Sequence, residues 1–80
     1  MTVRFVDAAE AELDEAFRHY ESESPGLGAH FLTELTIVVN RILEFPDAWQ
    51  KLEGGIRCCR FKRFPYGVVY AVRSNYIVLL

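Results

Sequence analysis

No hydrophobic run in this 80-residue chain approaches the roughly twenty apolar residues that a membrane-spanning helix needs. The N-terminus also has no basic segment followed by an apolar core, which is the pattern of a secretory signal peptide. We therefore expect no membrane contact and no export, and the cytoplasm is the expected location.

Cysteine is scarce, because Cys58 and Cys59 are the only two and they are adjacent. A structural zinc site or a disulfide framework needs further ligands or cysteines at set spacings. We also expect neither His19 nor His30 to have a Cys, His or carboxylate at ligand spacing. The sequence therefore predicts two free thiols in a reducing cytoplasm, with no metal site and no cofactor.

Acidic residues are absent after Glu53. Up to that residue the chain has eleven Asp and Glu against four Lys and Arg, whereas the remainder has five Lys and Arg. Such asymmetry indicates a positive surface that meets an acidic partner, either nucleic acid or an acidic protein segment. The alternative interpretation is a strand whose solvent-facing side is simply basic.

The composition is that of a globular protein, with 51% hydrophobic and 14% aromatic residues. We expect a single domain over residues 1–80. A chain of this length buries only about 60–65% of the surface of its unfolded state, so its reserve of stability is small.

The first half of the chain predicts a strand at 2–6 and two helices. Asp7, with Glu10 three residues on, forms a variant capping box before a helix at 8–23. The segment 24–28 contains Pro25 and two glycines and breaks that helix. The second helix, at 27–45, carries a broad apolar face suited to covering a sheet. That face consists of Phe31, Leu35, Val38 and Ile42, with Leu32, Val39 and Leu43 beside them.

After Gly55 the apolar period changes to two, which predicts three strands at 56–62, 66–73 and 76–80. A turn near Phe64-Pro65 and a tight turn at Ser74-Asn75 join them into an antiparallel meander. The predicted fold class is α+β, with the order β-α-α-β-β-β and a helical hairpin packed on a small, mostly antiparallel sheet.

Several motifs, in this order and spacing, resemble the RelE/ParE superfamily of bacterial toxins from type II toxin–antitoxin modules. More narrowly, the chain is similar to the ParE-like, plasmid-stabilisation branch, and the resemblance covers almost the whole chain, from Val3 to Leu79. The shared motifs are Ala11-Glu12-Leu13-Asp14-Glu15-Ala16, Tyr20-Glu21, Ser24-Pro25-Gly26-Leu27-Gly28, Phe31-Leu32, Ile42-Leu43-Glu44-Phe45-Pro46, Gly55-Ile56-Arg57 and Arg63-Phe64-Pro65-Tyr66-Gly67-Val68-Val69-Tyr70.

The resemblance implies the same β-α-α-β-β-β fold and a toxin that is neutralised by a cognate antitoxin. The ParE-like branch implies inhibition of DNA gyrase rather than chemistry of the toxin's own. Two alternatives stay open: a ribosome-dependent mRNA-cleaving enzyme like the RelE branch, and a truncated copy that only binds antitoxin. The resemblance also implies a polar C-terminal tail beyond Leu80, and we expect this domain to lack it.

Cleavage of RNA at a 2′-hydroxyl needs a base, a cation to stabilise the developing charge, and an acid for the leaving oxygen. Arg60, Lys62, Arg63 and Arg73 supply cations, but Arg and Lys at ordinary pKa are poor bases. No catalytic residue is therefore assigned. Tyr66 and Tyr70 would be the first candidates for a missing base, although sharing one face with Val68 favours packing.

The predicted partner-binding residues are Arg60, Lys62, Arg63, Tyr66 and Arg73, all on or beside the basic hairpin. For Arg63, at the hairpin bend, a structural alternative stays open, in which it pairs with an acidic group of the first helix. The strand at 76–80 has no following segment to cover it, so we expect an exposed apolar edge that promotes self-association. The candidate partners are thus an antitoxin, gyrase, the ribosome with its mRNA in the alternative interpretation, and a second copy of the chain.

Overall fold

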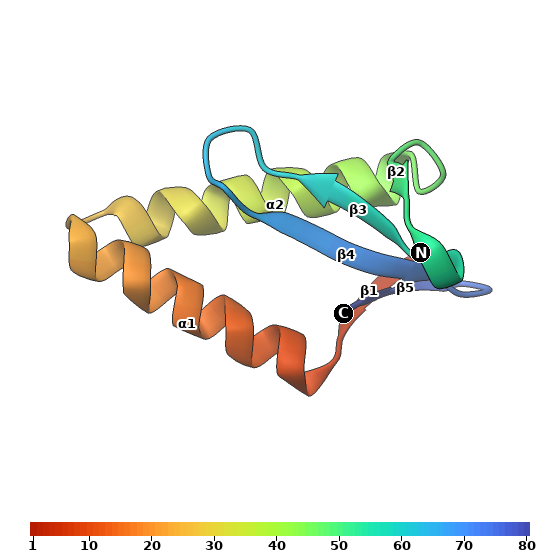
Figure 1. Cartoon of the computed structure of the whole chain (residues 1–80), viewed down its shortest axis with the longest axis horizontal. Coiled ribbons are helices and arrows are strands. Elements are labelled where there is room, and N and C mark those ends of the chain that lie inside the picture. Colours follow the sequence, from red (N-terminus) through yellow and green to blue (C-terminus); the bar gives the residue numbers. More distant parts are fainter.

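The computed structural model describes residues 1–80 and has two helices and a five-stranded mixed sheet (Figure 1). In chain order the elements are β1 (Thr2–Phe5), α1 (Asp7–Glu23), α2 (Leu27–Glu44), β2 (Gln50–Lys51), a 3-10 turn (Glu53–Gly55), β3 (Arg57–Arg60), β4 (Gly67–Val72) and β5 (Tyr76–Leu79). The spatial order of the strands is β1-β5-β4-β3-β2. This arrangement confirms the predicted α+β class and the order of its main elements.

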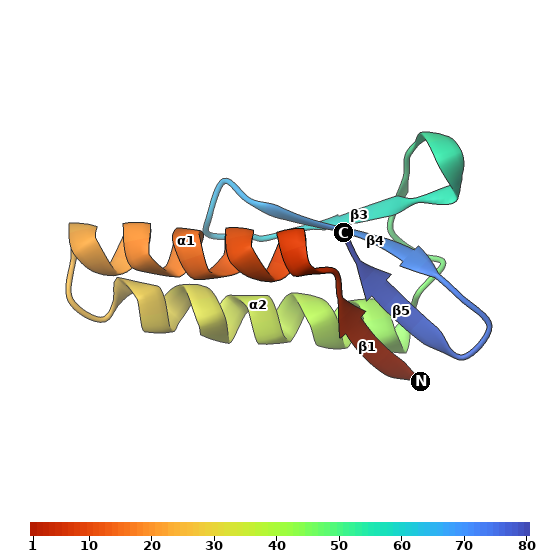
Figure 2. The ribbon, with the colours of Figure 1, turned by 90° about the horizontal axis from the view of Figure 1, so that it is seen from below.

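The two-residue strand β2 was not predicted, because it is too short to show an apolar period. It pairs antiparallel with β3, with Gln50 opposite Cys58. The helices run side by side in opposite directions, and α2 lies along the sheet while α1 diverges from it (Figures 1 and 2). Neither helix is sufficiently long and apolar to cross a membrane.

The predicted exposed edge at the last strand is wrong. β5 lies inside the sheet, between β4 and β1, and Ile77 and Leu79 are 0% and 2% exposed. The cover comes from β1, which pairs with β5 in parallel from Thr2 opposite Tyr76 to Phe5 opposite Leu79. No pattern in the sequence indicated a partner for β1. Because β1 covers β5, the reason for expecting self-association through β5 no longer holds.

The start of α1 also differs from the prediction. The helix begins at Asp7, its N-cap is Val6, and no side chain caps it. Asp7 therefore lies inside the first turn instead of capping it, where its charge still interacts favourably with the helix dipole. The apolar face of α1 is confirmed: Ala9 is buried, and Leu13 and Tyr20 pack against the core.

The joint between the helices is held by one carboxylate from α1. Glu21 accepts hydrogen bonds from the backbone N–H groups of Gly26 and Gly28, at 3.1 and 3.0 Å, and so caps α2 across the turn. Gly26 has a φ of 88°, which favours glycine. A Cβ at Gly28 would lie only 2.8 Å from the Phe17 ring, so the close approach of the helices requires glycine there too.

The core lies between α2 and the sheet. Phe31, Val38 and Ile42 of α2 are fully buried, together with Tyr70 of β4 and Ile77 of β5. This confirms most of the predicted apolar stripe and the packing role of Tyr70. Of the residues placed beside that stripe, Leu32 is 42% exposed and faces away from the sheet.

Candidate partner-binding surfaces

The loop between β3 and β4, residues 61–66, extends past the sheet and lies over the helices (Figure 2). Glu34 of α2 holds it there. Its Oε1 accepts hydrogen bonds from the backbone N–H groups of Lys62 and Arg63, at 2.7 and 2.8 Å. Glu34 is only 8% exposed, and its Oε2 is buried without a hydrogen-bond partner. One buried carboxylate thus fixes the backbone at Lys62 and Arg63, two exposed cations of the loop.

A cluster of aromatic rings joins the same loop to the helices. The Phe31 ring stacks on Phe61, with centroids 5.2 Å apart, and makes edge contacts with Phe64 at 5.4 Å and Tyr66 at 5.2 Å. Tyr20 of α1 joins the cluster through Phe64, at 4.8 Å. Edge and offset contacts at these distances are the favourable geometries for aromatic rings. The cluster therefore ties the loop to both helices.

The predicted partner-binding residues do not form one surface. Lys62 and Arg63 are exposed on the loop, where they share a groove with Arg41 of α2. Arg60 is exposed on β3 and lies over Gly67 on the neighbouring strand. Arg73 follows the far end of β4, which at about 3.3 Å per residue places it roughly 20 Å from the loop.

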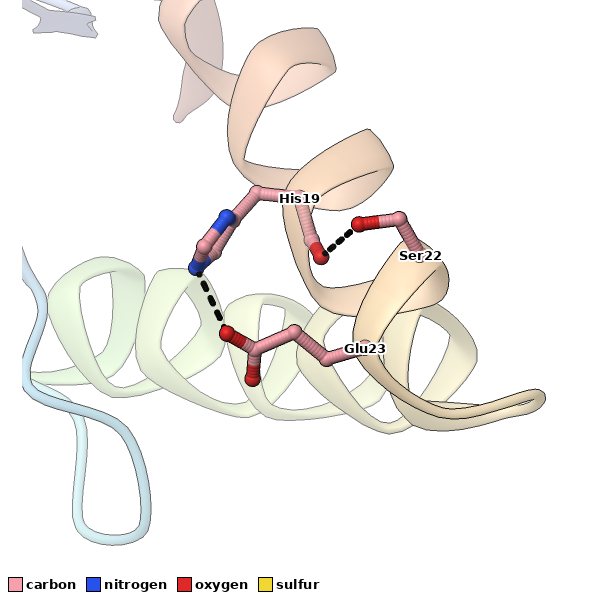
Figure 3. A network of polar contacts seen from close by, with 3 residues as sticks. All are labelled: His19, Ser22 and Glu23. Atoms are coloured by element: carbon pink, nitrogen blue, oxygen red, sulfur yellow. Dashed lines mark hydrogen bonds and ion pairs between the residues drawn. The ribbon is translucent and has the colours of Figure 1, made fainter.

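The alternative in which Arg63 pairs with α1 is wrong: Arg63 makes no ion pair, and its backbone N–H donates to Glu34 of α2. The chain contains a single side-chain ion pair, between His19 Nε2 and Glu23 at 3.2 Å (Figure 3). Glu23 is four residues after His19, so the expectation that His19 has no carboxylate at such a spacing is wrong. The two side chains are 62% and 56% exposed, and a pair this open contributes little to stability.

The groove shared by Lys62 and Arg63 is called here the basic groove. It lies between α2 and the loop, encloses about 490 Å³, and is lined on α2 by Leu27, His30, Thr33, Ile37 and Arg41. These helix positions recur every three or four residues and so fall on one face. Glu34 lies on the boundary between this face and the core stripe, where it reaches the loop.

A second groove, called here the apolar groove, lies between α1, α2 and the end of the sheet. It encloses about 280 Å³, and nine of its twelve lining residues are hydrophobic. Phe5 and Leu80, which both line it, are 39% and 44% exposed. Leu13, Leu35 and Val69 line the wall between them.

Two tyrosines considered as bases are placed unfavourably for that role. The Tyr70 side chain is fully buried, and its hydroxyl donates to the carbonyl of Pro46 at 2.7 Å. Burial raises the pKa of both phenols, and the Glu12 carboxylate raises the pKa of Tyr66 further. Both phenols are therefore protonated at neutral pH. Cys58 and Cys59 are free thiols, and burial raises the pKa of Cys59.

Glu34, Ile37 and Arg41 were missed at the level of sequence. A signal for Glu34 was present, because it lies three residues after Phe31 and four before Val38, in the middle of the buried stripe. A carboxylate at such a position needs hydrogen-bond donors from a neighbouring element. The donors are the backbone N–H groups of Lys62 and Arg63, which lie 28 and 29 positions after Glu34 in the chain. Helical periodicity does not predict contacts with so distant a segment.

Comparison with known proteins finds a matching family and a solved structure with a similar fold. The family model described as the ParE toxin of the type II toxin–antitoxin system ParDE matches residues 3–80. A similar solved structure is the chromosomal ParDE toxin–antitoxin system from P. aeruginosa, with a TM-score of 0.78 and 20% sequence identity, covering 100% of this chain and 90% of that one. Among curated proteins, none matches the sequence. At this identity the structural similarity shows the fold, whereas the family match extends over nearly every residue.

Proposed function

This chain belongs to the ParE toxin family of type II toxin–antitoxin systems, and from that premise we propose that it inhibits DNA gyrase and is neutralised by a cognate antitoxin. The observation that carries the proposal is the family match over residues 3–80. Gyrase inhibition requires binding rather than bond-breaking, which suits a molecule whose exposed features are two grooves and a fixed basic loop.

The apolar groove is the proposed docking site of the antitoxin. An amphipathic helix or extended segment that filled it would bury the exposed parts of Phe5 and Leu80. Burial of apolar surface stabilises a complex by about 25 cal/mol per Å² before the costs of association are subtracted. Phe5 also ends the edge strand β1, so a partner in the groove is well placed to add a strand there.

Two observations argue against the alternative of RNA cleavage. Tyr70 is inaccessible, and the raised pKa of Tyr66 disfavours the phenolate that a general base would need. His19 contacts Glu23 and shares a cleft with Tyr66. His30 lines the basic groove with Lys62 and Arg63, where the other acid–base group besides these cations is Glu34, whose Oε1 is committed to the loop backbone. General acid–base assistance is typically worth about 10²–10⁴ in rate, so without it ribosome-bound mRNA should survive exposure to this protein.

Two assays on the purified chain test the proposal. The first measures supercoiling of relaxed plasmid by gyrase, with and without the antitoxin encoded beside the gene. The second measures the integrity of ribosome-bound mRNA. We expect supercoiling to fall as the toxin is added and to recover with an equimolar amount of antitoxin, while the mRNA stays intact.

Cuts in mRNA that follow the codon phase would overturn the proposal in favour of a RelE-like enzyme. Intact supercoiling and intact mRNA, together with tight antitoxin binding, would overturn the gyrase part. That result would leave a chain whose function is confined to binding antitoxin.

A further inference from the structure

The basic groove has the features of a binding site, and neither the family match nor the proposed antitoxin contact assigns a role to it. Arg41, Lys62 and Arg63 face it with a single carboxylate, Glu34, among them. None of the three cations forms an ion pair within the chain, whose one ion pair is on α1. Their charges are therefore available to a partner.

The groove is also partly apolar. Ile37 lies between the cations and is 44% exposed, and Leu27 and Phe64 contribute further apolar surface at the end of the groove. From residue 27 to residue 41 the helix advances about 21 Å, which matches roughly six residues of extended chain. A ligand complementary to this lining would carry negative charges opposite the cations and an aliphatic side chain opposite Ile37.

We propose that the basic groove binds an acidic protein segment with an aliphatic side chain, seated between Arg41 and the Lys62–Arg63 loop with that side chain on Ile37. The site is separate from the apolar groove, with which it shares no lining residue. The two sites can therefore be occupied together. Because the inference concerns direct binding to this chain, its test does not depend on gyrase.

A peptide suits this groove better than a nucleic acid. A phosphodiester backbone would bring only negative charge and acceptors next to the Glu34 carboxylate. A peptide backbone instead brings N–H donors, and its leucine or isoleucine side chains match Ile37. Exposed aliphatic surface gives no comparable advantage to phosphate groups, whose recognition rests on cations and donors.

The loop is prepared for such a ligand by Glu34. Its two hydrogen bonds fix the backbone at Lys62 and Arg63, so those side chains extend from a held position and not from a free loop. Ordering a loop during association costs free energy, and a loop that is already ordered avoids that cost. Substitution of the Lys62 and Arg63 side chains leaves these backbone bonds in place, so the variants below should fold.

The test uses a fluorescein-labelled synthetic peptide of alternating glutamate and leucine, titrated with the full chain by fluorescence anisotropy. Three competitors report on the chemistry: the same peptide with glutamine in place of glutamate, polyglutamate, and an oligothymidylate. We expect the glutamate–leucine peptide to bind most tightly, with an affinity that falls as salt is raised. The glutamine peptide and polyglutamate should each bind more weakly, because each retains only one of the two features.

Two pairs of variants locate the site. The double variant Lys62→Gln/Arg63→Gln should weaken binding about tenfold, because it removes two exposed charge contacts. Its matched control, Arg60→Gln/Arg73→Gln, removes two cations outside the groove and should change the affinity less than about twofold. Ile37→Ser should weaken binding roughly threefold to tenfold. The matched control is Leu32→Ser, since Leu32 is similarly exposed (42%) on the same helix but lies outside this groove.

Several results would overturn the inference. Equal weakening by the two double variants would indicate diffuse attraction without a site. Tighter binding of oligothymidylate than of the peptide would assign the groove to nucleic acid. If circular dichroism shows the protein to be folded and the peptide still does not bind, the groove does not bind this class of ligand. Sedimentation that shows self-association relieved by Lys62→Gln/Arg63→Gln would assign the groove to a second copy of the chain.

Discussion

The apolar groove and the basic groove lie on the same 18-residue helix, α2, yet they are built from opposite chemistry. Leu35 contributes to the first and Ile37 to the second, only two positions apart. Side chains two residues apart point in very different directions on a helix. A short helix can therefore present one wall to an apolar partner and another to an acidic one.

The two grooves also form for different physical reasons. The apolar groove exists because α1 diverges from the sheet and leaves Phe5, Leu13 and Leu80 incompletely covered (Figure 1). The basic groove exists because one carboxylate and an aromatic cluster hold a loop against α2. Incomplete packing thus creates the first surface, whereas specific polar and aromatic contacts create the second.

The largest effect should come from removing the residue at the centre of the aromatic cluster, which packs against the loop. Phe31 is fully buried at the centre of the aromatic cluster, and Phe31→Ala should lower the free energy of unfolding by about 3–5 kcal/mol. A domain of this size has little stability to lose, so much of the variant should be unfolded. Urea denaturation followed by circular dichroism measures the change. A loss below about 1 kcal/mol would show that the cluster is not a main support of the fold.

A change confined to the apolar groove should separate binding from stability. We expect Phe5→Ser to weaken antitoxin binding by about 2 kcal/mol, roughly thirtyfold, because it removes an exposed aromatic anchor. Phe45→Ser is the matched control, since Phe45 is 56% exposed but lines neither groove. Calorimetric titration of both variants with antitoxin gives the comparison. Similar losses in the two variants would argue against the apolar groove as the docking site.

Removal of the Glu34 carboxylate should increase the mobility of the loop between β3 and β4. Glu34→Ala removes two charge-assisted hydrogen bonds and should lower the free energy of unfolding by about 2 kcal/mol. Hydrogen exchange at the Lys62 and Arg63 amides should accelerate more than exchange in β5. The control Glu44→Ala changes an exposed carboxylate of the same helix and should stay within about 0.5 kcal/mol. Uniform acceleration throughout the sheet would show that Glu34 supports the whole fold and has no special effect on the loop.

These predictions depend on features that the sequence revealed to very different degrees. The helical hairpin and the three-stranded meander could be predicted because Pro25, Pro46 and Gly55 mark their boundaries and the apolar period changes from helix to strand. The parallel pairing of β1 with β5 could not be predicted, since it joins the two ends of the chain and leaves no local pattern.

The candidate site was only partly predictable for the same reason. The basic character of residues 57–73 was visible in the sequence, and Lys62 and Arg63 do lie in a groove together. Arg41 joins them from a helix more than twenty residues earlier, and Glu34 is linked to them by backbone hydrogen bonds. Alternation along one strand carries no information on such contacts, and the shared charge of the hairpin also grouped Arg73 with residues roughly 20 Å away.

The smallest expected effect is on the pH dependence of stability. Burial raises the pKa of Tyr66, Tyr70 and Cys59 in the folded chain, so folding favours their neutral forms. This contribution is complete below the pKa of each group in the unfolded chain, and it is lost as the pH rises through the higher folded value. Stability should therefore fall at alkaline pH, and Tyr66→Phe should make the decline shallower. Urea midpoints measured at increasing pH test this, and an unchanged slope in Tyr66→Phe would contradict it.

The independence of the two grooves is tested most directly by one titration. The chain is saturated with its antitoxin, and the glutamate–leucine peptide is then added while its binding is followed by anisotropy. We expect the peptide to bind the toxin–antitoxin complex with an affinity within about twofold of that for the free toxin, because the proposed antitoxin site is confined to the apolar groove. Loss of peptide binding, or release of antitoxin by the peptide, would show that a single partner uses both grooves.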